Sequence, residues 1–472
     1  MFERSLQVTL MGSLYSHARK VYICMGSNKS TGFDSDIPSV ITDATSLAED
    51  GILPTLSSRH PLRTDSRWHQ IAALAENQWF QRTWVVQEAA LAQNPRVLYG
   101  EVEFGYRDLT TVLRWLNQSS WAAQFGIPAF FIHLQWADWK ASPLQPEYTF
   151  LDLLSHASLL SCSDPRDKIY AFLGHPLAQT INGSLIVTPN YEKSPSVVFL
   201  ELSKVLVQQI GLRTLASVEH TPLTILQDFP SWVTQWDVAV ALNDIWIVPN
   251  DAFHASAGLT PKLPVITTNN SLVLRGVILD RIQQSFLIDV FRDVAPLFQD
   301  VITGEETTFL KSLQTLHERG DGSPYDDHTE AFCQTLCIGM RGLNKKLYAT
   351  AIIIAKYFAN LTSEQKSLGI AEKLSTLRDD DGTYFSMMRG FCTNRSLVVT
   401  EKGYYALAPL LTMPGDVACV LNGADVPFIL RPVEDSQKFK LLGESYVHGM
   451  MEGQVSEMMR QGELFEQTIT LH

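Results

Sequence analysis

The sequence predicts an α/β domain, followed by a mostly helical region and then by a small antiparallel β region. Near the start, an amphipathic helical pattern runs into a short apolar segment that fits a strand. Helical periodicity dominates the middle, and near the end short strand-like segments alternate with turn residues. Because 472 residues exceed one compact core, we expect several domains and predict the divisions 1–118, 119–260 and 261–472.

The composition is that of an ordinary soluble globular protein, with 45% hydrophobic and 18% charged residues. The net charge of −13 and the lack of a basic run argue against nucleic-acid binding. Six scattered cysteines form no dense framework, which favours reduced thiols and a cytoplasmic location. The chain opens without an apolar signal core, and its most apolar helical run is short and carries Lys356, so we expect no membrane span.

The first domain is predicted to open with a helix and a strand. Residues Glu3 to Ala18 read as an amphipathic helix, because leucines recur on one stripe at positions Leu6, Leu10 and Leu14. Residues Val21 to Met25 form a short apolar run that fits a buried strand. A helix followed by a buried strand is typical of half of a parallel α/β unit.

The stretch from Gln78 to Gly100 contains two tryptophans, an arginine and a glutamate within ten residues. If it is a helix, one stripe holds Phe80, Trp84, Glu88 and Leu91. A glutamate on such an apolar face must pair with a cation or hold its proton to higher pH. Glu88 is therefore either a structural ion pair or helix cap, or a catalytic or ligand-binding carboxylate in a cleft.

The helical middle region contains an aromatic stretch and a helix-start motif. The aromatic stretch, residues 115–139, is flanked only by Arg114 and Lys140, so we interpret it as core packing and not as a nucleic-acid stacking surface. In the motif SDPRDKIYAFLG, Asp164 suits an N-cap and Pro165 the first helical position. The motif is read as a helix start that docks two domains, and a direct role in binding stays open.

The last region is predicted to be mainly β-structure. Residues 263–282 favour a hairpin around Asn269-Asn270, and five further strand candidates follow at 396–400, 404–407, 416–421, 427–431 and 440–447. A candidate acid/base set consists of Glu444, Tyr446, His448 and Glu452. Strand alternation places the first three on one face, where they could instead satisfy one another. No metal site is predicted, because Cys333 and Cys337 lack a second ligand pair.

Several long segments resemble one known family. WFQRTWVVQEAALA, with ERSLQVTLMGSLYSHARKVYICMG before it and DPRDKIYAFLG after it, resembles the heterokaryon incompatibility (HET) domain proteins of filamentous fungi. FPSWVTQWD and GESYVHGMMEG look like downstream signatures of the same family. The resemblance covers most of the chain, least between about Gln283 and Leu377. Met1 stands where the family pattern is already under way, so we expect an N-terminally shortened member or a mis-assigned start.

The resemblance implies a role in fungal allorecognition, in which programmed cell death follows the fusion of genetically different hyphae. It also implies a protein partner or self-association. HET domains are distantly similar to Toll/interleukin-receptor (TIR) domains, so the first domain is expected to be a partial TIR-like, flavodoxin-like α/β fold. Some TIR domains cleave NAD with a glutamate in a W-x-x-x-E pattern, and Trp84 and Glu88 match that spacing.

If the similarity extends to activity, the chain is an NAD glycohydrolase with Glu88 as its catalytic residue. Glu88 would hydrogen-bond the ribose and stabilise an oxocarbenium-like transition state, while Trp84 and Phe80 would bind the substrate. NAD would be a substrate and no cofactor is expected, since the chain has neither a G-x-G-x-x-G motif nor a P-loop.

Three non-enzymatic readings compete with NAD cleavage. The chain could be a signalling or scaffold module that self-associates through its α/β domain, while the C-terminal region senses a partner. It could be an inactive, truncated paralogue. It could also be encoded in a secondary-metabolite gene cluster without taking part in the cluster's chemistry, which the sequence does not test.

Overall fold

The computed structural model describes residues 2–26, 36–48, 53–57, 59–117, 125–126, 148–180, 182–238, 245, 253–287, 324–339, 388, 390–434 and 436–472. The chain forms two compact units, Met1–Leu202 and Ser203–His472, which are treated separately here. The domain boundaries after residues 118 and 260 remain predictions. Within the described ranges, no helix is both long enough and apolar enough to cross a bilayer.

The first unit holds helices and a small sheet. Its elements in chain order are α1 (Phe2–His17), β1 (Val21–Cys24), α2 (Asp36–Thr45), η1 (Pro61–Thr64), α3 (Trp68–Ala75), η2 (Gln78–Gln81), α4 (Val85–Ala90), β2 (Pro95–Tyr99), β3 (Val102–Gly105), α5 (Tyr106–Asn117), α7 (Phe150–His156), α8 (Asp167–Tyr170) and η4 (Pro176–Ala178). Helix α9 (Pro195–Ile210) begins in this unit and ends in the second.

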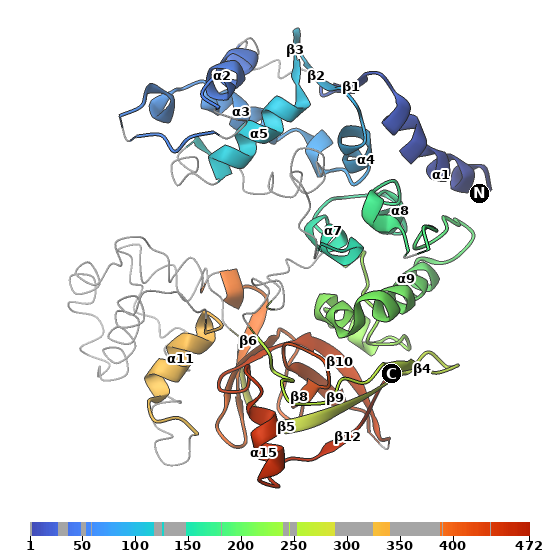
Figure 1. The fold of residues 1–472 in the computed structure, drawn as a ribbon, viewed down its shortest axis with the longest axis vertical. Helices are drawn as coiled ribbons and strands as arrows, with labels where there is room; N and C mark the ends of the chain where they lie inside the picture. Colours follow the sequence, from blue (N-terminus) through green and yellow to red (C-terminus); the bar gives the residue numbers. More distant parts are fainter. Residues whose placement is uncertain are drawn as a thin grey trace. The chain divides into compact units, whose positions relative to one another are not determined.

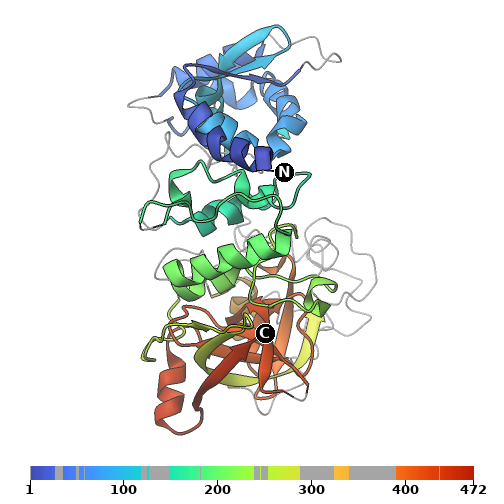
Figure 2. The same ribbon diagram turned by 90° about the vertical axis from the view of Figure 1, so that its right-hand side faces the viewer.

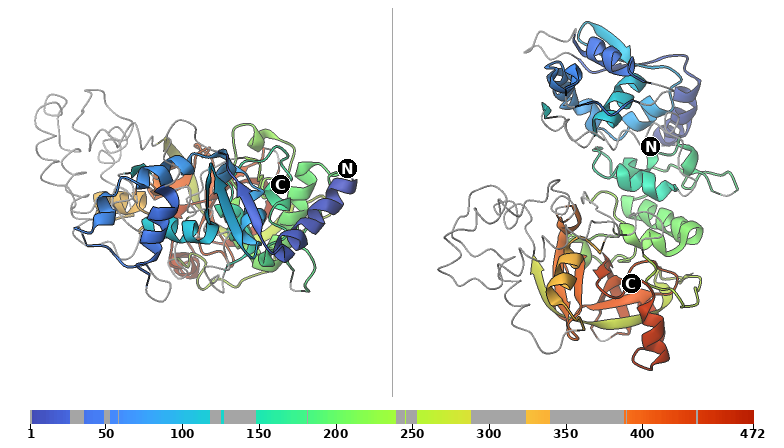
Figure 3. Two further views of the ribbon diagram at one scale, coloured as in Figure 1. Left: turned by 90° about the horizontal axis from the view of Figure 1, so that it is seen from above. Right: turned by 60° about the vertical axis from the view of Figure 1, so that its left-hand side comes forward.

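The sheet of the first unit has the order β1-β2-β3. β1 and β2 are parallel, with Val21 opposite Pro95, and β2 and β3 are antiparallel. Helices α2, α3 and α5 lie on one side of the sheet and α1 and α4 on the other (Figures 1 and 3). The predicted opening helix and strand are present, and the parallel pairing fits an α/β unit, but β1 is an edge strand in which only Ile23 is buried, so the prediction of a buried strand is wrong. A TIR-like or flavodoxin-like fold remains a prediction.

Helix α1 turns a different side to the core from the one its leucines predict. The leucines are exposed, at 52% for Leu6, 56% for Leu10 and 64% for Leu14, whereas Val8 is buried. Gly12 packs inward, where an added Cβ would lie 2.9 Å from the Cα of Gly174. The helix thus approaches its neighbour on the side of Val8 and Gly12, and the leucine stripe points outward.

The central stretch is not one continuous helix. It forms the short turn η2, then extended backbone at Arg82, and then α4, with Trp84 at its N-cap. The helical hydrogen bonding is interrupted here because the backbone pairs with Ser161 instead. The Thr83 N–H donates to the Ser161 carbonyl at 2.9 Å, and the Ser161 N–H donates to the Gln81 carbonyl at 2.6 Å. The predicted single stripe is therefore wrong, and Phe80 stands on a different element from Trp84 and Glu88.

The second unit is built around a barrel. Its elements are η5 (Gly211–Ser217), η6 (Thr224–Leu226), β4 (Val265–Ile266), β5 (Leu272–Leu287), α11 (His328–Leu336), β6 (Arg395–Thr400), β7 (Tyr405–Pro409), β8 (Val417–Leu421), β9 (Phe428–Pro432), β10 (Lys438–Glu444), β11 (Tyr446–Val447), α15 (Gln454–Arg460) and β12 (Glu466–Leu471). The strands run β5-β12-β10-β9-β8, and β8 pairs again with β5. This last pairing closes the ring that Figure 2 shows curling around itself.

The barrel confirms most of the predicted strands and corrects two points. The hairpin around Asn270 is present as β4 and β5, and the next four candidates are β6 to β9. The last candidate is split into β10 and β11 at Ser445, whose N–H donates to Pro427 at 2.8 Å. β12 is an additional strand that pairs parallel with β10, so the sheet is larger than predicted and not purely antiparallel.

Candidate functional site

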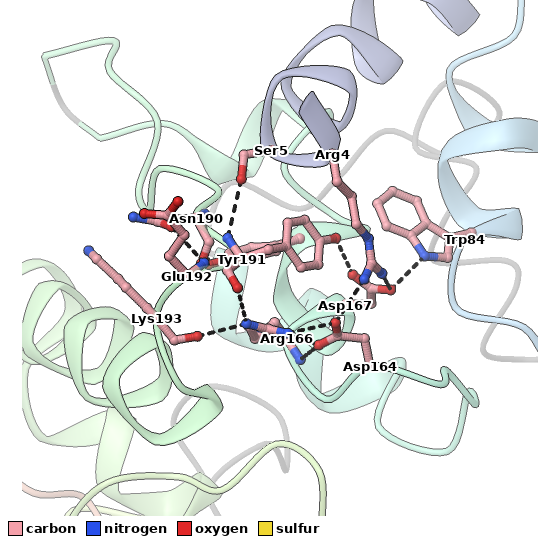
Figure 4. A network of polar contacts seen from close by, with 11 residues as sticks. Arg4, Ser5, Trp84, Asp164, Arg166, Asp167, Asn190, Tyr191, Glu192 and Lys193 are labelled. Atoms are coloured by element: carbon pink, nitrogen blue, oxygen red, sulfur yellow. Dashed lines mark hydrogen bonds and ion pairs between the residues drawn. The ribbon is translucent and has the colours of Figure 1, made fainter. Parts of the chain in front are cut away.

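The central stretch and the DPRDKIY motif meet in the first unit through Trp84 and Asp167. The Trp84 indole Nε1–H donates to Asp167 Oδ2 at 3.1 Å (Figure 4). The same oxygen accepts from Arg4 Nη2 at 3.0 Å, and the Tyr191 hydroxyl donates to the other oxygen. The Asp167 side chain is only 5% exposed, so a buried carboxylate joins three distant segments.

The local backbone explains how Asp167 is positioned. The Asp164 side chain accepts the Arg166 N–H at 3.1 Å, and the Asp164 carbonyl accepts the Asp167 N–H at 2.9 Å. Helix α8 therefore begins at Asp167, two residues later than the predicted start at Pro165. The capping role predicted for Asp164 becomes the closing of the turn that precedes the helix.

Arg166 fastens a second loop to this turn. Its Nε and Nη2 donate to the two oxygens of Asp164 at 2.8 and 2.9 Å, and its Nη1 donates to the carbonyls of Tyr191 and Lys193 at 2.6 and 2.7 Å. The guanidinium lowers the pKa of Asp164. Arg166 therefore pairs within the motif, and Lys168 Nζ donates to the carbonyls of Ser158 and Leu160 at 2.6 Å each.

Tyr191 fills the centre of this network. The guanidinium carbon of Arg4 lies 3.9 Å from the ring centroid and that of Arg166 lies 5.0 Å from it. Tyr170 packs edge-to-face on the same ring, with centroids 5.2 Å apart. Burial and the hydrogen bond to Asp167 raise the pKa of Tyr191. The tyrosine thus stays neutral, and its hydroxyl donates a hydrogen bond to the carboxylate.

Glu88 lies outside this network. Its N–H donates to the Trp84 carbonyl at 3.3 Å, which places the two residues one turn apart on α4. Its carboxylate is 20% exposed and lies 3.8 Å from Arg82 Nη2, longer than a charge-assisted hydrogen bond. Burial, and then the Glu88 charge, raise the pKa of Tyr15. Glu88 therefore has a weak ion pair and remains accessible.

Phe80 does not share a surface with Glu88. Its ring is 1% exposed and belongs to the hydrophobic core of the first unit. It packs edge-to-face on Trp79 with centroids 5.2 Å apart. Of the three residues predicted from the spacing, the structure brings Trp84 and Glu88 together and places Phe80 in the core.

The chemistry open to the two carboxylates differs. Asp167 is occupied by three donors and is nearly inaccessible, so its role here is to hold Trp84, Arg4 and Tyr191 in place. Glu88 can accept a hydrogen bond from a ligand hydroxyl. Sequence reasoning missed Arg4 and Tyr191 because 163 and 24 positions separate them from Asp167, and no local pattern links residues so far apart.

The acidic and aromatic set of the barrel divides into two pairs. The Tyr446 hydroxyl and His448 Nδ1 lie 3.0 Å apart, as expected if they satisfy each other. Glu444 instead accepts from Arg395 Nη2 at 2.8 Å, with both side chains less than 5% exposed. Burial lowers the pKa of His448 to about 4. Nothing in this arrangement supplies a nucleophile among the described residues.

Comparisons with known proteins define the class. Residues 1–88 match the family described as heterokaryon incompatibility protein (HET), and residues 346–466 match the Het-6 β-barrel domain. The first match ends on Glu88 and the second contains β6 to β11. No solved structure matches the chain. The start of the chain and its barrel are therefore similar to two domains of fungal heterokaryon incompatibility proteins, the family that the motifs indicate.

A particular relative matches across both units. The chain is 21% identical over 565 aligned positions to heterokaryon incompatibility protein 6, OR allele, of Neurospora crassa. The alignment covers 98% of this chain and 80% of the relative. The two units therefore occur together in a fungal incompatibility protein.

Proposed function

We propose that this chain acts in fungal non-self recognition, in the cytoplasm and with a protein partner, and that its first unit cleaves NAD at Glu88. The family matches and the Neurospora relative support the first part. One observation carries the second part: Glu88 lies one turn from Trp84 on α4, is accessible, and has only a long ion pair to Arg82.

The reaction would be hydrolysis of the bond between nicotinamide and ribose. Glu88 accepts a hydrogen bond from a ribose hydroxyl, and its charge stabilises the oxocarbenium-like transition state. The C–N bond breaks with its electron pair passing to nicotinamide, water adds to the anomeric carbon, and one proton leaves to solvent. The Trp84 ring, whose N–H is held by Asp167, forms a fixed wall. The Phe80 ring is buried in this conformation, so its contact with the substrate stays a prediction that nothing in the described surface supports.

The activity test is release of nicotinamide from NAD by the purified full chain. We expect release by the wild type and at least a hundredfold slower release by Glu88→Gln, which keeps the shape and removes the charge; a loss of about 2.7 kcal/mol in transition-state stabilisation corresponds to that factor. Glu101→Gln, at an exposed glutamate outside α4, should match the wild type. Equal rates for Glu88→Gln and the wild type, or no release by the folded wild type, contradict the proposal.

A non-enzymatic assembly function is the second candidate, and the surface of α1 favours it. Leu6, Leu10 and Leu14 form an exposed apolar stripe, and Tyr22 on the edge strand β1 is 50% exposed. If assembly alone triggers cell death, Leu10→Glu abolishes killing in a fungal expression assay, whereas Glu88→Gln leaves killing intact. The reverse result supports NAD cleavage.

A further inference from the structure

The barrel of the second unit carries a pocket that is independent of the proposed function. It is open to solvent and has a volume of about 610 Å³. Its walls come from η6, β5, the turn between β7 and β8, the end of β9, and β10. The volume falls within the range of about 300–1,000 Å³ that is typical of small-molecule sites.

Much of the lining is apolar. Ile225, Leu226, Met413 and Val433 contribute apolar side chains to it. Leu226 is 79% exposed and Met413 is 49% exposed, so their side chains are available to a ligand. Pro414 and Pro432 restrict the backbone of two wall segments, which favours a pocket formed before a ligand arrives.

One acidic group of the lining is already neutralised. Asp416, with a 1% exposed side chain, accepts from Arg431 Nε and Nη2 at 2.8 and 2.9 Å. The Met413 N–H donates to the same carboxylate at 2.9 Å. Asp416 and Arg431 therefore build the wall and leave no net charge for a ligand.

Two further cations lack such a counter-ion. Arg281 Nη1 donates to the Gly415 carbonyl at 2.9 Å, and Lys440 Nζ donates to the Ile225 carbonyl at 2.6 Å. Within the part of the chain that the structure describes, neither side chain forms an ion pair with a carboxylate. Glu434, the remaining acid of the lining, is exposed. A chain of net charge −13 thus places two uncompensated positive groups beside an apolar surface.

We propose that this pocket binds a small amphipathic carboxylate, in which an apolar body carries one carboxylate group. The apolar body packs on Ile225, Leu226 and Met413, and burial of that surface drives association. The ligand's carboxylate accepts charge-assisted hydrogen bonds from Arg281 and Lys440. These bonds use N–H groups of the two side chains that are now directed partly to solvent. A neutral or cationic ligand of the same size lacks this second contribution.

The test is isothermal titration calorimetry of the full chain with octanoate, and with octan-1-ol and octylamine as probes of charge. Octanoate should bind at least about tenfold more tightly than either, which is about 1.4 kcal/mol. Arg281→Gln and Lys440→Gln should each weaken octanoate binding by about tenfold. Lys402→Gln removes the same charge at an exposed position outside the pocket and should leave binding unchanged.

Three results overturn the proposal. The first is no binding of octanoate by the wild type up to about 10 mM, well above a Kd of about 1 mM. The second is equal binding of octylamine, and the third is unchanged octanoate binding by Arg281→Gln. Lys440 also supports the Ile225 carbonyl, so melting curves accompany its variant; if that variant unfolds, Arg281→Gln decides the outcome.

Discussion

At the scale of single residues, the carboxylate of Asp167 shows how the two motifs of the first unit depend on each other. It accepts hydrogen bonds from an indole, a phenol and a guanidinium that come from three separate segments. Trp84 of the W-x-x-x-E pattern is therefore held by a hydrogen bond to Asp167, whereas the side chain of Glu88 has only the 3.8 Å ion pair to Arg82 among the described residues.

Asp167→Asn should destabilise the first unit by about 2–3 kcal/mol, because it removes a buried charge from three donors and leaves Tyr191 and Trp84 poorly paired. Urea unfolding followed by tryptophan fluorescence measures the change. Asp43→Asn, which breaks an exposed ion pair with Arg67, should cost less than about 1 kcal/mol. An Asp167 variant as stable as the wild type would show that the network adds nothing.

Sequence reasoning reached part of this site. The spacing of Trp84 and Glu88 was visible because both lie within one turn of helix. The partner of Trp84 was not, since it is 83 positions away and no local pattern marks it. The spacing also puts Phe80 on the same helix. The pairing that breaks this helix joins Thr83 to the distant Ser161, so no local pattern reveals it.

At the scale of elements, α1 shows that the more hydrophobic side of a helix does not always face the core. Gly12 and Gly174 approach so closely that their Cα atoms leave no room for a side chain. Three leucines are left outside as a result. Periodicity identified the helix correctly, but only the tertiary contact decides which side is buried.

Gly12→Val should lower the melting temperature of the first unit, because its Cβ would stand 2.9 Å from the Gly174 backbone, which cannot move as a flexible side chain would. The expected loss is about 1–3 kcal/mol, the usual cost of overpacking. Ser13→Val adds the same side chain on the exposed side of the helix and should cost well under 1 kcal/mol. Similar melting temperatures for the two variants would argue against close packing at Gly12.

At the scale of the whole molecule, both units keep neutral histidines in their interiors. Burial lowers the pKa of His175 in the first unit and of His448 in the second to about 4, and lowers that of His220. In the unfolded chain the imidazoles take up a proton near pH 6.5, whereas in the folded chain His175 and His448 stay neutral down to about pH 4. The unfolded state therefore takes up more protons in that window.

The contribution of His175 and His448 to the free energy of unfolding should consequently be complete above about pH 6.5 and fall as the pH is lowered towards about 4, by up to about 1.4 kcal/mol per pH unit for each. Urea unfolding at several pH values measures the slope. His448→Gln should flatten the slope for the second unit, while His17→Gln, at an exposed position, should not. Glu219 in the second unit, whose pKa burial raises to about 7, has the opposite pH dependence, so a flat profile for the first unit is the result that would contradict the burial of a neutral imidazole.

The barrel marks the limit of what the sequence predicts at this scale. Alternation of apolar residues located β6 to β9, because each strand carries its own signal. Closure depends on β5 pairing with both β12 and β8, and on a parallel contact between β10 and β12. No local pattern encodes those contacts, so a ring could not be distinguished from an open sheet.

The pairing of β5 with β6 also bears on how this barrel can change over evolutionary time. Leu287, at the end of β5, lies opposite Ser396 near the start of β6, so the long intervening segment leaves and rejoins the ladder at one place. The entropy of closing such a segment grows only slowly with its length. The β5–β6 pairing therefore tolerates changes in the length of that segment outside α11, which packs on β7 through Phe332.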